Sequence, residues 1–424
     1  MQGDPGNRLS LTVRILIGMG GGFAAGVLLN LFGNAFIEEY VVEGLFHIGG
    51  SIFLASLKLL VVPLVFVSLV CGTAALEDIT KLGRIGGRTL ALYLSTTAIA
   101  ISLALLATIV VRPGDGFDLQ TDASFVAQPA PSLADTLINL FPSNPIRAMA
   151  EGNMLQIIVF SVLFGLAITM AGSPGKRVLA VFNDLNGVIL RLVMLLMAIA
   201  PYGVFCLIAK VFALQGFAAI LPLARYFFVV LAVLIVHALI TYPGMLRFLA
   251  GLSPVAFFRK MRDPLVLAFS TASSNATLPV TLENAERRLG VHNSIASFTI
   301  PLGATINMDG TAIMQGVATG FIAQAYGIEI GATGYLMVVL TATLASIGTA
   351  GVPGVGLIML AMVLRQVNLP VEGIGLIIGV DRLLDMVRTA VNVTGDCAVT
   401  CIVAKSEGRL SKEIFDGRAD PPQS

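Results

Sequence analysis

Several charged side chains lie inside an apolar segment near the C-terminus that is long enough to cross a bilayer. The polar positions of this segment are separated by four, three, four and four residues: Asp381, Asp385, Arg388, Asn392 and Asp396. At about 100° per residue in an α-helix, the five side chains fall within roughly 80° of one another and form one stripe. Each charge at mid-membrane costs about 2.5–3.5 kcal/mol unless it is paired or faces a wet cavity. The stripe therefore indicates an ion or substrate pathway, with a self-neutralised structural network as the alternative.

The composition indicates a polytopic membrane protein. Hydrophobic residues make up 56% of the 424 and charged residues only 12%, whereas soluble domains carry about 25% charged residues. The net charge of +1 argues against nucleic acid as a partner, because nucleic-acid binding relies on an excess of basic residues. The four cysteines form no CxxC pair and the three histidines are scattered. We therefore expect no disulfide or zinc site, and we assign the histidines to the core or to loops.

Hydropathy predicts eight membrane-spanning segments of about 20 residues or more. They cover residues 12–36, 44–77, 86–112, 131–172 with a break, 178–213, 221–249, 294–323 and 371–404. Two further apolar segments, 255–290 and 332–366, are interrupted at residues 270–275 and 348–356. Gly and Pro break helices, and each freed backbone group in a membrane needs a partner, so neither segment is expected to be one continuous helix.

The loop charges predict the topology. Basic residues follow the second, fourth, sixth and last spans and the first interrupted segment, while the remaining loops are acidic or uncharged. The positive-inside rule is satisfied if both termini are cytoplasmic and each interrupted segment enters and leaves on one side. The predicted fold is an all-α polytopic membrane protein with eight transmembrane helices and two re-entrant helical hairpins, one from each face. Interrupted segments in corresponding positions of two inverted repeats are typical of transporter binding sites.

A second polar cluster lies in the seventh predicted span, as the string Asn-Met-Asp-Gly-Thr at 307–311. An intramembrane aspartate beside Asn and Thr suits a hard monovalent cation, which binds carboxylate, amide and carbonyl oxygens. On the stripe itself, the fork of Arg388 can hold a carboxylate with two parallel hydrogen bonds. Asp385, about one turn away, suits an ammonium group. Together these two side chains describe a ligand with an extra carboxylate and an amine, which fits aspartate or glutamate.

Five motifs from about residue 85 to 405 carry a family resemblance. They are SNP at 143–145, SSNATLPVT at 273–281, GATINMDGTAI at 303–313, ASIGTAGVPGVG at 345–356 and DMVRTAVNVTGD at 385–396. In order and spacing they resemble the glutamate transporter family, the dicarboxylate/amino acid:cation symporters. The first two spans agree in length and place but carry no sharp motif.

The resemblance implies a homotrimer in the plasma (inner) membrane, in which a mobile transport domain moves against a scaffold as an elevator. It implies no enzyme activity. On this basis the scaffold is expected to comprise residues 1–85, with the first two helices, and 113–220, with helices four and five and an extracellular loop. The transport domain is expected to comprise 86–112, which is the third helix, and 221–408. Residues 409–424 are expected to form a cytoplasmic tail.

The resemblance also implies the sites. Arg388 would hold the side-chain carboxylate of the substrate and Asp385 its amino group. The rest of the substrate site would comprise Asn392, Thr389, Thr311 and Ser274 with the backbone of Val352 and Gly356. Three sodium sites would be formed by Gly303, Asn307, Asn392 and Asp396, by Tyr93, Thr96, Thr97, Asn307 and Asp309, and by the carbonyls of Thr305, Met308, Ser346, Ile347 and Thr349.

Two departures from the family pattern bear on selectivity. Relatives carry an arginine at the position of Ala272 or of Met386, and this chain has neither. Arg382, about 100° from the stripe, either substitutes for that arginine or pairs with a neighbouring acid; Asp381 either tunes ion entry or neutralises Arg382. The second departure is Gln315, which stands where proton-carrying animal relatives have Glu and cannot take up a proton, so sodium coupling is favoured.

Other functions were weighed against this one. Within transporters, the alternative is a proton-coupled acidic amino acid or C4-dicarboxylate symporter. Relatives that carry plain C4-dicarboxylates typically lack the aspartate found here at Asp385. An intramembrane aspartyl protease would use Asp309 and Asp396, but its usual second motif is missing. An ion channel would leave the Arg388–Asp385 pair without a ligand.

Overall fold

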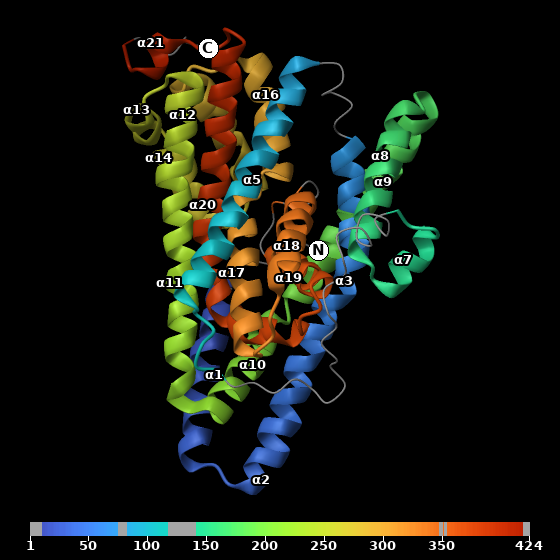
Figure 1. Cartoon of the computed structure of the whole chain (residues 1–424), viewed down its shortest axis with the longest axis vertical. Coiled ribbons are helices and arrows are strands. Elements are labelled where there is room, and N and C mark those ends of the chain that lie inside the picture. Colours follow the sequence, from blue (N-terminus) through green and yellow to red (C-terminus); the bar gives the residue numbers. More distant parts are fainter. Residues whose placement is uncertain (1–10, 75–82, 118–140, 347–350, 352–353, 419–424) are drawn as a thin grey trace, which may run out of the picture.

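The computed structural model describes residues 11–74, 83–117, 141–346, 351 and 354–418, and these residues form helices joined by short connections (Figure 1). Extended pairing in this part of the chain is confined to two isolated bridges, Asp115–Phe117 and Val291–Leu410. Five of the described helical stretches are long and apolar enough to cross a membrane: Val13–Phe32, Ala35–Ala74, Arg84–Val111, Ser173–Met197 and Ile220–Ala250. The predicted all-α class with several apolar helices is confirmed.

The first helices reproduce the first three predicted spans within a few residues, although the second helical stretch begins earlier. They are α1 (Leu11–Phe32), α2 (Ala35–Ile37), η1 (Glu38–Phe46), α3 (His47–Ala74) and α5 (Arg84–Val111). Glycines at 18, 22 and 26 line the face of α1 that packs on α10 (Ala200–Gln215). A Cβ at any of the three would lie within 2.6 Å of a backbone oxygen of α10. Small residues spaced by four therefore let these two helices approach closely, as is common in membranes.

The fifth predicted span, 178–213, was wrong as a single helix. In this region the structure has α9 (Ser173–Met197) and α10, followed by η2 (Gly216–Ala219), whereas α7 (Pro145–Glu151) and α8 (Met154–Met170) lie within the fourth predicted span, 131–172, which was expected to be broken. The break after Met197 has a local cause in Pro201, which has no N–H and whose ring clashes with the carbonyl four residues earlier. The sixth span is formed by α11 (Ile220–Val236), η3 (His237–Thr241) and α12 (Tyr242–Ala250), which run on without a gap.

Both predicted interruptions coincide with breaks between helices. The first segment comprises α13 (Pro254–Lys260), α14 (Arg262–Thr271), α15 (Ser274–Glu283) and η4 (Asn284–Arg288). Its chain reverses at Ala272, which takes a left-handed conformation with φ 49°. The second comprises α18 (Gly331–Ser346) and α19 (Val355–Gln366), and the predicted interruption at 348–356 falls largely between them.

The seventh predicted span, 294–323, was also wrong as one helix. It divides into α16 (Asn293–Ile306) and α17 (Asp309–Ala325), which meet at Asn307 and Met308. These two residues leave the helical conformation, with φ/ψ of −90°/86° and −112°/45°. The amide freed at Gly310 donates to the Asn392 side chain at 2.7 Å, so a polar side chain from another helix satisfies it.

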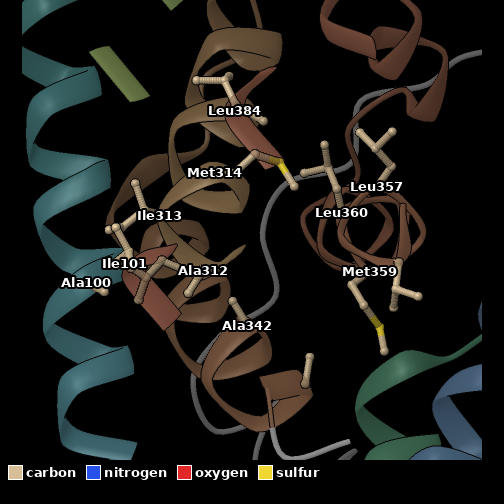
Figure 2. Close-up of a cluster of buried hydrophobic side chains, with 14 of the residues drawn as sticks. Ala100, Ile101, Ala312, Ile313, Met314, Ala342, Leu357, Met359, Leu360 and Leu384 are labelled. Atoms are coloured by element: carbon tan, nitrogen blue, oxygen red, sulfur yellow. The ribbon is translucent and has the colours of Figure 1, made fainter. Parts of the chain in front are cut away.

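The last described helices are η5 (Val371–Gly373), α20 (Ile374–Ser406) and α21 (Lys412–Phe415). Of these, α20 is buried along most of its length. Figure 1 shows α20 running beside α11, α12 and α14, with α3, α8 and α9 on the far side of α18 and α19. Figure 2 shows apolar side chains of α5, α17, α18, α19 and α20 meeting in one cluster, among them Ile101, Met314 and Leu360.

The chain after α20 folds back onto the transmembrane bundle. Val291 and Leu410 form the second bridge, Ser411 donates its amide to the Gly290 carbonyl at 2.8 Å, and Phe415 is fully buried. The region predicted as a cytoplasmic tail, 409–424, is therefore packed against the base of the first interrupted segment over its first residues. All four cysteines are free thiols.

Candidate functional site

The predicted stripe lies on a single helix. Asp381, Asp385, Arg388, Asn392 and Asp396 all fall within α20, and none is more than 9% exposed. Each is three or four residues from the next, so the helix places them on one face as predicted. Charges buried to this extent need partners, and the partners differ between the two ends of the stripe.

At the first end, one arginine is held between two aspartates. Arg388 Nη1 donates to Asp381 Oδ1 at 2.7 Å, and its Nη2 donates to Asp385 Oδ1 at 2.7 Å. Its Nε is buried and has no hydrogen-bond partner within the described part of the chain. The guanidinium therefore donates to two of the protein's own carboxylates through its two Nη groups, and its Nε–H has no acceptor among the described residues.

Arg382 pairs with Asp385. Its Nη1 lies 3.2 Å from Asp385 Oδ2, and both side chains are 12% exposed. Of the two roles predicted for Arg382, the pairing with a neighbouring acid is observed. Asp381, which was expected either to tune ion entry or to neutralise Arg382, instead forms its ion pair with Arg388. The cross-pairing depends on side-chain rotamers, which helical spacing alone does not fix.

The two interrupted segments meet beside this cluster. The Ser273 hydroxyl donates to the Gly351 carbonyl at 2.7 Å, and Ser274 begins α15 with its side chain buried. Gly356, in the first turn of α19, faces Arg388 and Thr311, because a Cβ there would lie 3.3 Å from Arg388 Nη2 and 3.3 Å from Thr311 Cγ2.

The remaining residues predicted for the substrate site sit around these. Thr389 is buried and donates its hydroxyl to the Asp385 carbonyl at 2.8 Å. Asn392 accepts from the Gly310 amide and so lies between the two ends of the stripe. Val352 lies outside the described residues.

The second half of the site centres on Asp309, which is fully buried at the start of α17. Thr97 of α5 donates to its Oδ1 at 2.7 Å, and Thr96 lies 3.3 Å from the same atom. Thr96 also contacts the Asn307 side-chain oxygen at 3.2 Å. The structure thus gathers four of the five residues predicted for one sodium site, from three separate helical segments. The fifth, Tyr93, lies one turn before Thr96 and Thr97 on α5.

Asp396 lies next to this group. Its Oδ1 accepts from Asn307 Nδ2 at 2.9 Å, and the same amide lies 3.3 Å from the Asn392 carbonyl. A Cβ at Gly303 would lie 2.5 Å from Asp396 Oδ1 and 2.6 Å from the Tyr93 hydroxyl. The glycine therefore lets the backbone of α16 approach a carboxylate and a phenol closely.

The third predicted cation set is only partly described. Thr305 is the penultimate residue of α16, and Met308 lies in the gap between α16 and α17. The Met308 carbonyl accepts from the Ala312 amide at 2.8 Å. Ser346 is the buried last residue of α18. Ile347 and Thr349 lie outside the described residues, so the geometry of this set is not tested.

Electrostatics distinguishes the two ends of the stripe. Asp309 and Asp396 are at most 1% exposed, and within the described residues neither forms an ion pair with a lysine or arginine. Burying an ionised carboxylate without a cation is costly. This half of the site therefore needs an external positive charge, either a metal cation or a proton.

Two further residues of the cation half escaped the sequence analysis. The Tyr242 hydroxyl donates to Asp309 Oδ2 at 2.8 Å, and His237 Nε2 lies 3.1 Å from the same oxygen. Both are fully buried, and His237 begins the π-helical turn η3. The sequence analysis assigned this histidine to the core or a loop; it is buried, but its ring also contacts a carboxylate. Short π-helical segments are frequent at functional sites, yet nothing in the local sequence pairs position 237 with position 309.

The first turn of α5 and the C-terminal end of α20 are held together by charges outside the apolar core. Arg84 donates to Glu407 at 2.7 Å and Arg88 at 2.8 Å. The hydrogen bond from Arg84, together with the charges of both arginines, holds the pKa of the Glu407 carboxyl below its usual range. These contacts tie the helix that carries Thr96 and Thr97 to the helix that carries Asp396.

Comparison with known proteins agrees with this geometry. A profile of the sodium:dicarboxylate symporter family matches residues 11–406. The chain is 36% identical over 418 residues to the proton/glutamate-aspartate symporter of Escherichia coli K12, covering 96% of this chain and 95% of that protein. It is 35% identical over 415 residues to the proton/sodium-glutamate symport protein of Geobacillus stearothermophilus, covering 96% of each.

A further relative is named for a different substrate. The C4-dicarboxylate transport protein of Rhodospirillum rubrum is 36% identical over 375 residues, covering 86% of this chain and 83% of that protein. The match of the profile to nearly the whole chain, together with these identities, shows the family. The chain belongs to the sodium:dicarboxylate symporter family, whose members are membrane transporters and not enzymes.

Proposed function

We propose that this protein is a secondary active symporter that carries L-aspartate or L-glutamate into the cell, driven by the sodium gradient. The observation that supports it most is the division of one buried stripe into two chemically different halves. One half presents guanidinium and carboxylate groups, Arg388 and Asp385, which suit an acidic amino acid. The other presents Asp309 and Asp396, which have no lysine or arginine partner among the described residues, and this suits a cation.

The two halves share residues, which gives coupling a physical route. Asn392 accepts from the Gly310 amide at 2.7 Å, next to Thr311 of the substrate half, and its carbonyl contacts Asn307 of the cation half. A cation that orders Asn307 and Asp309 therefore fixes groups that border the substrate. Two ligands that stabilise the same arrangement bind cooperatively, and the coupling is reciprocal.

The predicted site residues keep their roles in this proposal. The substrate is held by Arg388, Asp385 and the residues around them, with the tips of both interrupted segments closing over it. Sodium is held at two sites around Asp396 and Asp309, and at a third built from carbonyls near Met308. Gln315 is buried in α17 and offers no carboxyl for a proton, which favours sodium over proton coupling.

The proposed architecture is the one that the family resemblance implies. Eight transmembrane helices and two re-entrant hairpins form a homotrimer in the plasma membrane, with both termini in the cytoplasm. The third, sixth, seventh and eighth spans and both hairpins move together as an elevator against the remaining helices. The ties between α5 and α20 at Glu407 and the packing of α5 on α17 support treating these elements as one body.

Uptake into proteoliposomes tests the proposal. The purified protein would be offered labelled L-aspartate with either a sodium gradient or a pH gradient as the only driving force. We expect accumulation with sodium, saturable in both substrate and ion. Uptake driven by the pH gradient but not by sodium would refute the ion assignment. Fumarate uptake with no uptake of acidic amino acids would refute the substrate assignment.

A C4-dicarboxylate symporter is the second candidate, and a specific contact favours it. Arg382 occupies Asp385 Oδ2 at 3.2 Å, so the group proposed to bind the substrate's amine is already engaged. A relative named as a C4-dicarboxylate transporter is 36% identical to this chain. Competition of unlabelled succinate against labelled L-aspartate in the same vesicles separates the two candidates.

A further inference from the structure

The charges at the substrate end of the stripe cancel one another. Two guanidiniums, Arg382 and Arg388, face two carboxylates, Asp381 and Asp385, in three ion pairs of 2.7, 2.7 and 3.2 Å. Both oxygens of Asp385 are engaged, Oδ1 by Arg388 and Oδ2 by Arg382. With these groups ionised, the cluster is neutral before any ligand arrives, so it offers an incoming ammonium no net attraction.

Arg382 is the member of the cluster that a substrate amine would have to compete with. An ammonium that binds Asp385 must share or take the Oδ2 position, because Oδ1 is held by Arg388, which is itself only 1% exposed. Like charges within a few ångströms repel strongly where the dielectric constant is low. The guanidinium of Arg382 therefore weakens binding of the amine while it attracts carboxylates.

The three side chains around this contact share one small cavity. Asp381, Arg382 and Asp385 line a partly open space of about 30 Å³ that is bordered elsewhere by apolar residues of α1, α3, α10 and α19, among them Ile15, Phe53 and Leu357. A space of this size holds about one water molecule. The side chains of Arg382 and Asp385 are each 12% exposed, so solvent screens the charge of Arg382 only in part, and that charge acts on Asp385 across 3.2 Å.

We propose that Arg382 sets the substrate specificity of this transporter by occupying Asp385, so that dicarboxylates without an amine are accepted nearly as well as acidic amino acids. The proposal rests on the function proposed above and names its substrate class more closely: four-carbon dicarboxylates with or without an α-amino group. Arg382 is a specificity-determining residue here, and Arg388 remains the group that grips the carboxylate.

The test compares L-aspartate with succinate, which has the same carbon skeleton and no amine. Apparent affinities for both are measured in proteoliposomes for the wild type, Arg382→Gln and Arg382→Met. Loss of the positive charge weakens carboxylate binding for both substrates alike, so that effect cancels in their ratio. We expect the preference for aspartate over succinate to rise about tenfold in both variants, equal to about 1.4 kcal/mol. Arg382→Lys, which keeps the charge, should leave the ratio within about twofold of the wild type.

Several outcomes would overturn the proposal. One is a ratio that stays within about twofold of the wild type in correctly folded Gln and Met variants. The wild type provides a check that needs no variant, because succinate should bind within about tenfold of L-aspartate. A wild-type preference for aspartate above about a hundredfold refutes the role of Arg382 while leaving the symport function intact. Transport of neither compound refutes the proposed function itself.

Discussion

The two ends of α20 handle buried charge in opposite ways. Near its start, Asp381 and Asp385 are matched by Arg382 and Arg388, with ion pairs as short as 2.7 Å. Further along, Asp396 has only an amide donor, Asn307, and its neighbour Asp309 has hydroxyls and an imidazole. The aspartates at both ends are at most 9% exposed, so burial alone does not separate them. The presence or absence of an arginine partner does.

The difference indicates what each end requires. A neutral cluster of two cations and two anions can exchange an internal carboxylate for one from a substrate at little net electrostatic cost. A pair of buried carboxylates without a cation stays unfavourable until a positive charge arrives. One helix thus carries two sites. At the first, a substrate carboxylate can replace an internal one in an ion pair; at the second, the carboxylates have no ion pair with an arginine or lysine among the described residues. Binding of a cation at the second site stabilises the geometry of the first.

The largest effect is expected from removing Arg388, whose guanidinium pairs with both aspartates at the substrate end of the stripe. Arg388→Ala leaves Asp381 and Asp385 without their main partner, and breaking a buried ion pair costs about 3–5 kcal/mol. Uptake of acidic substrates should fall by about 100-fold or more at a fixed concentration. Labelled aspartate uptake measures it, with sodium-dependent thermal stabilisation as the check on folding. Unchanged transport would contradict the role assigned to Arg388.

The next largest effect is expected on stabilisation by sodium, which should differ between variants at the two ends of the stripe. Sodium should raise the unfolding temperature of the purified wild type, because a ligand at about 100 times its Kd stabilises the folded state by about 2.7 kcal/mol. Asp396→Asn should lose most of this sodium-dependent shift. Asp385→Asn, on the same helix, should keep it, because its ion pairs are with arginines. Equal loss in both variants would show that the two ends do not bind different ligands.

A smaller effect is expected from the residues that orient Asp309. Tyr242→Phe removes one hydroxyl that donates to Oδ2, and a hydrogen bond to a charged group contributes about 1.5–3 kcal/mol. The sodium concentration for half-maximal uptake should rise about tenfold or more, with a smaller change in maximal rate. His237→Gln keeps a donor and should stay closer to the wild type than His237→Leu. If the maximal rate falls while sodium dependence is unchanged, Tyr242 has another role.

The smallest effect is expected at the ion pairs that Arg84 and Arg88 form with Glu407. Because Arg84 and Arg88 hold the pKa of Glu407 below its usual range, the pair stabilises the fold above the unfolded-state pKa of about 4.3 and is lost as pH falls through the lower folded value. Glu407→Gln should therefore lose less stability than the wild type between about pH 7 and about pH 3.5. Thermal unfolding at the two pH values measures this, and Glu39→Gln, at an exposed position of η1, is a control that leaves the α5–α20 tie in place.

Much of the site was predictable because its signals are local. The stripe on α20 follows from spacings of three and four residues, and helical geometry converts those spacings into a face. The interruption near Ala272 and the polar string around Asp309 are also local. The helix break at 198–199 could have been found in the same way, since Pro201 stands four residues after the last residue of α9.

Other features needed the folded chain. The division of the seventh span at Asn307 is closed by Asn392, a residue 82 positions away from the amide it binds. The partners of Asp309 come from α5 and from the sixth span, and His237 is 72 residues from it. No repeat or spacing links such positions, because contacts between helices depend on how whole segments pack.

The sequence by itself therefore determined that this chain crosses a membrane on helices and that one helix carries buried charges, since both follow from hydropathy and helical period. The tertiary structure decided how those charges are paired. Arg388 is held by Asp381 and Asp385, Arg382 by Asp385, and Asp396 by no arginine or lysine among the described residues. The pairing depends on side-chain rotamers and on neighbouring helices, and it is the pairing that distinguishes a substrate site from a cation site.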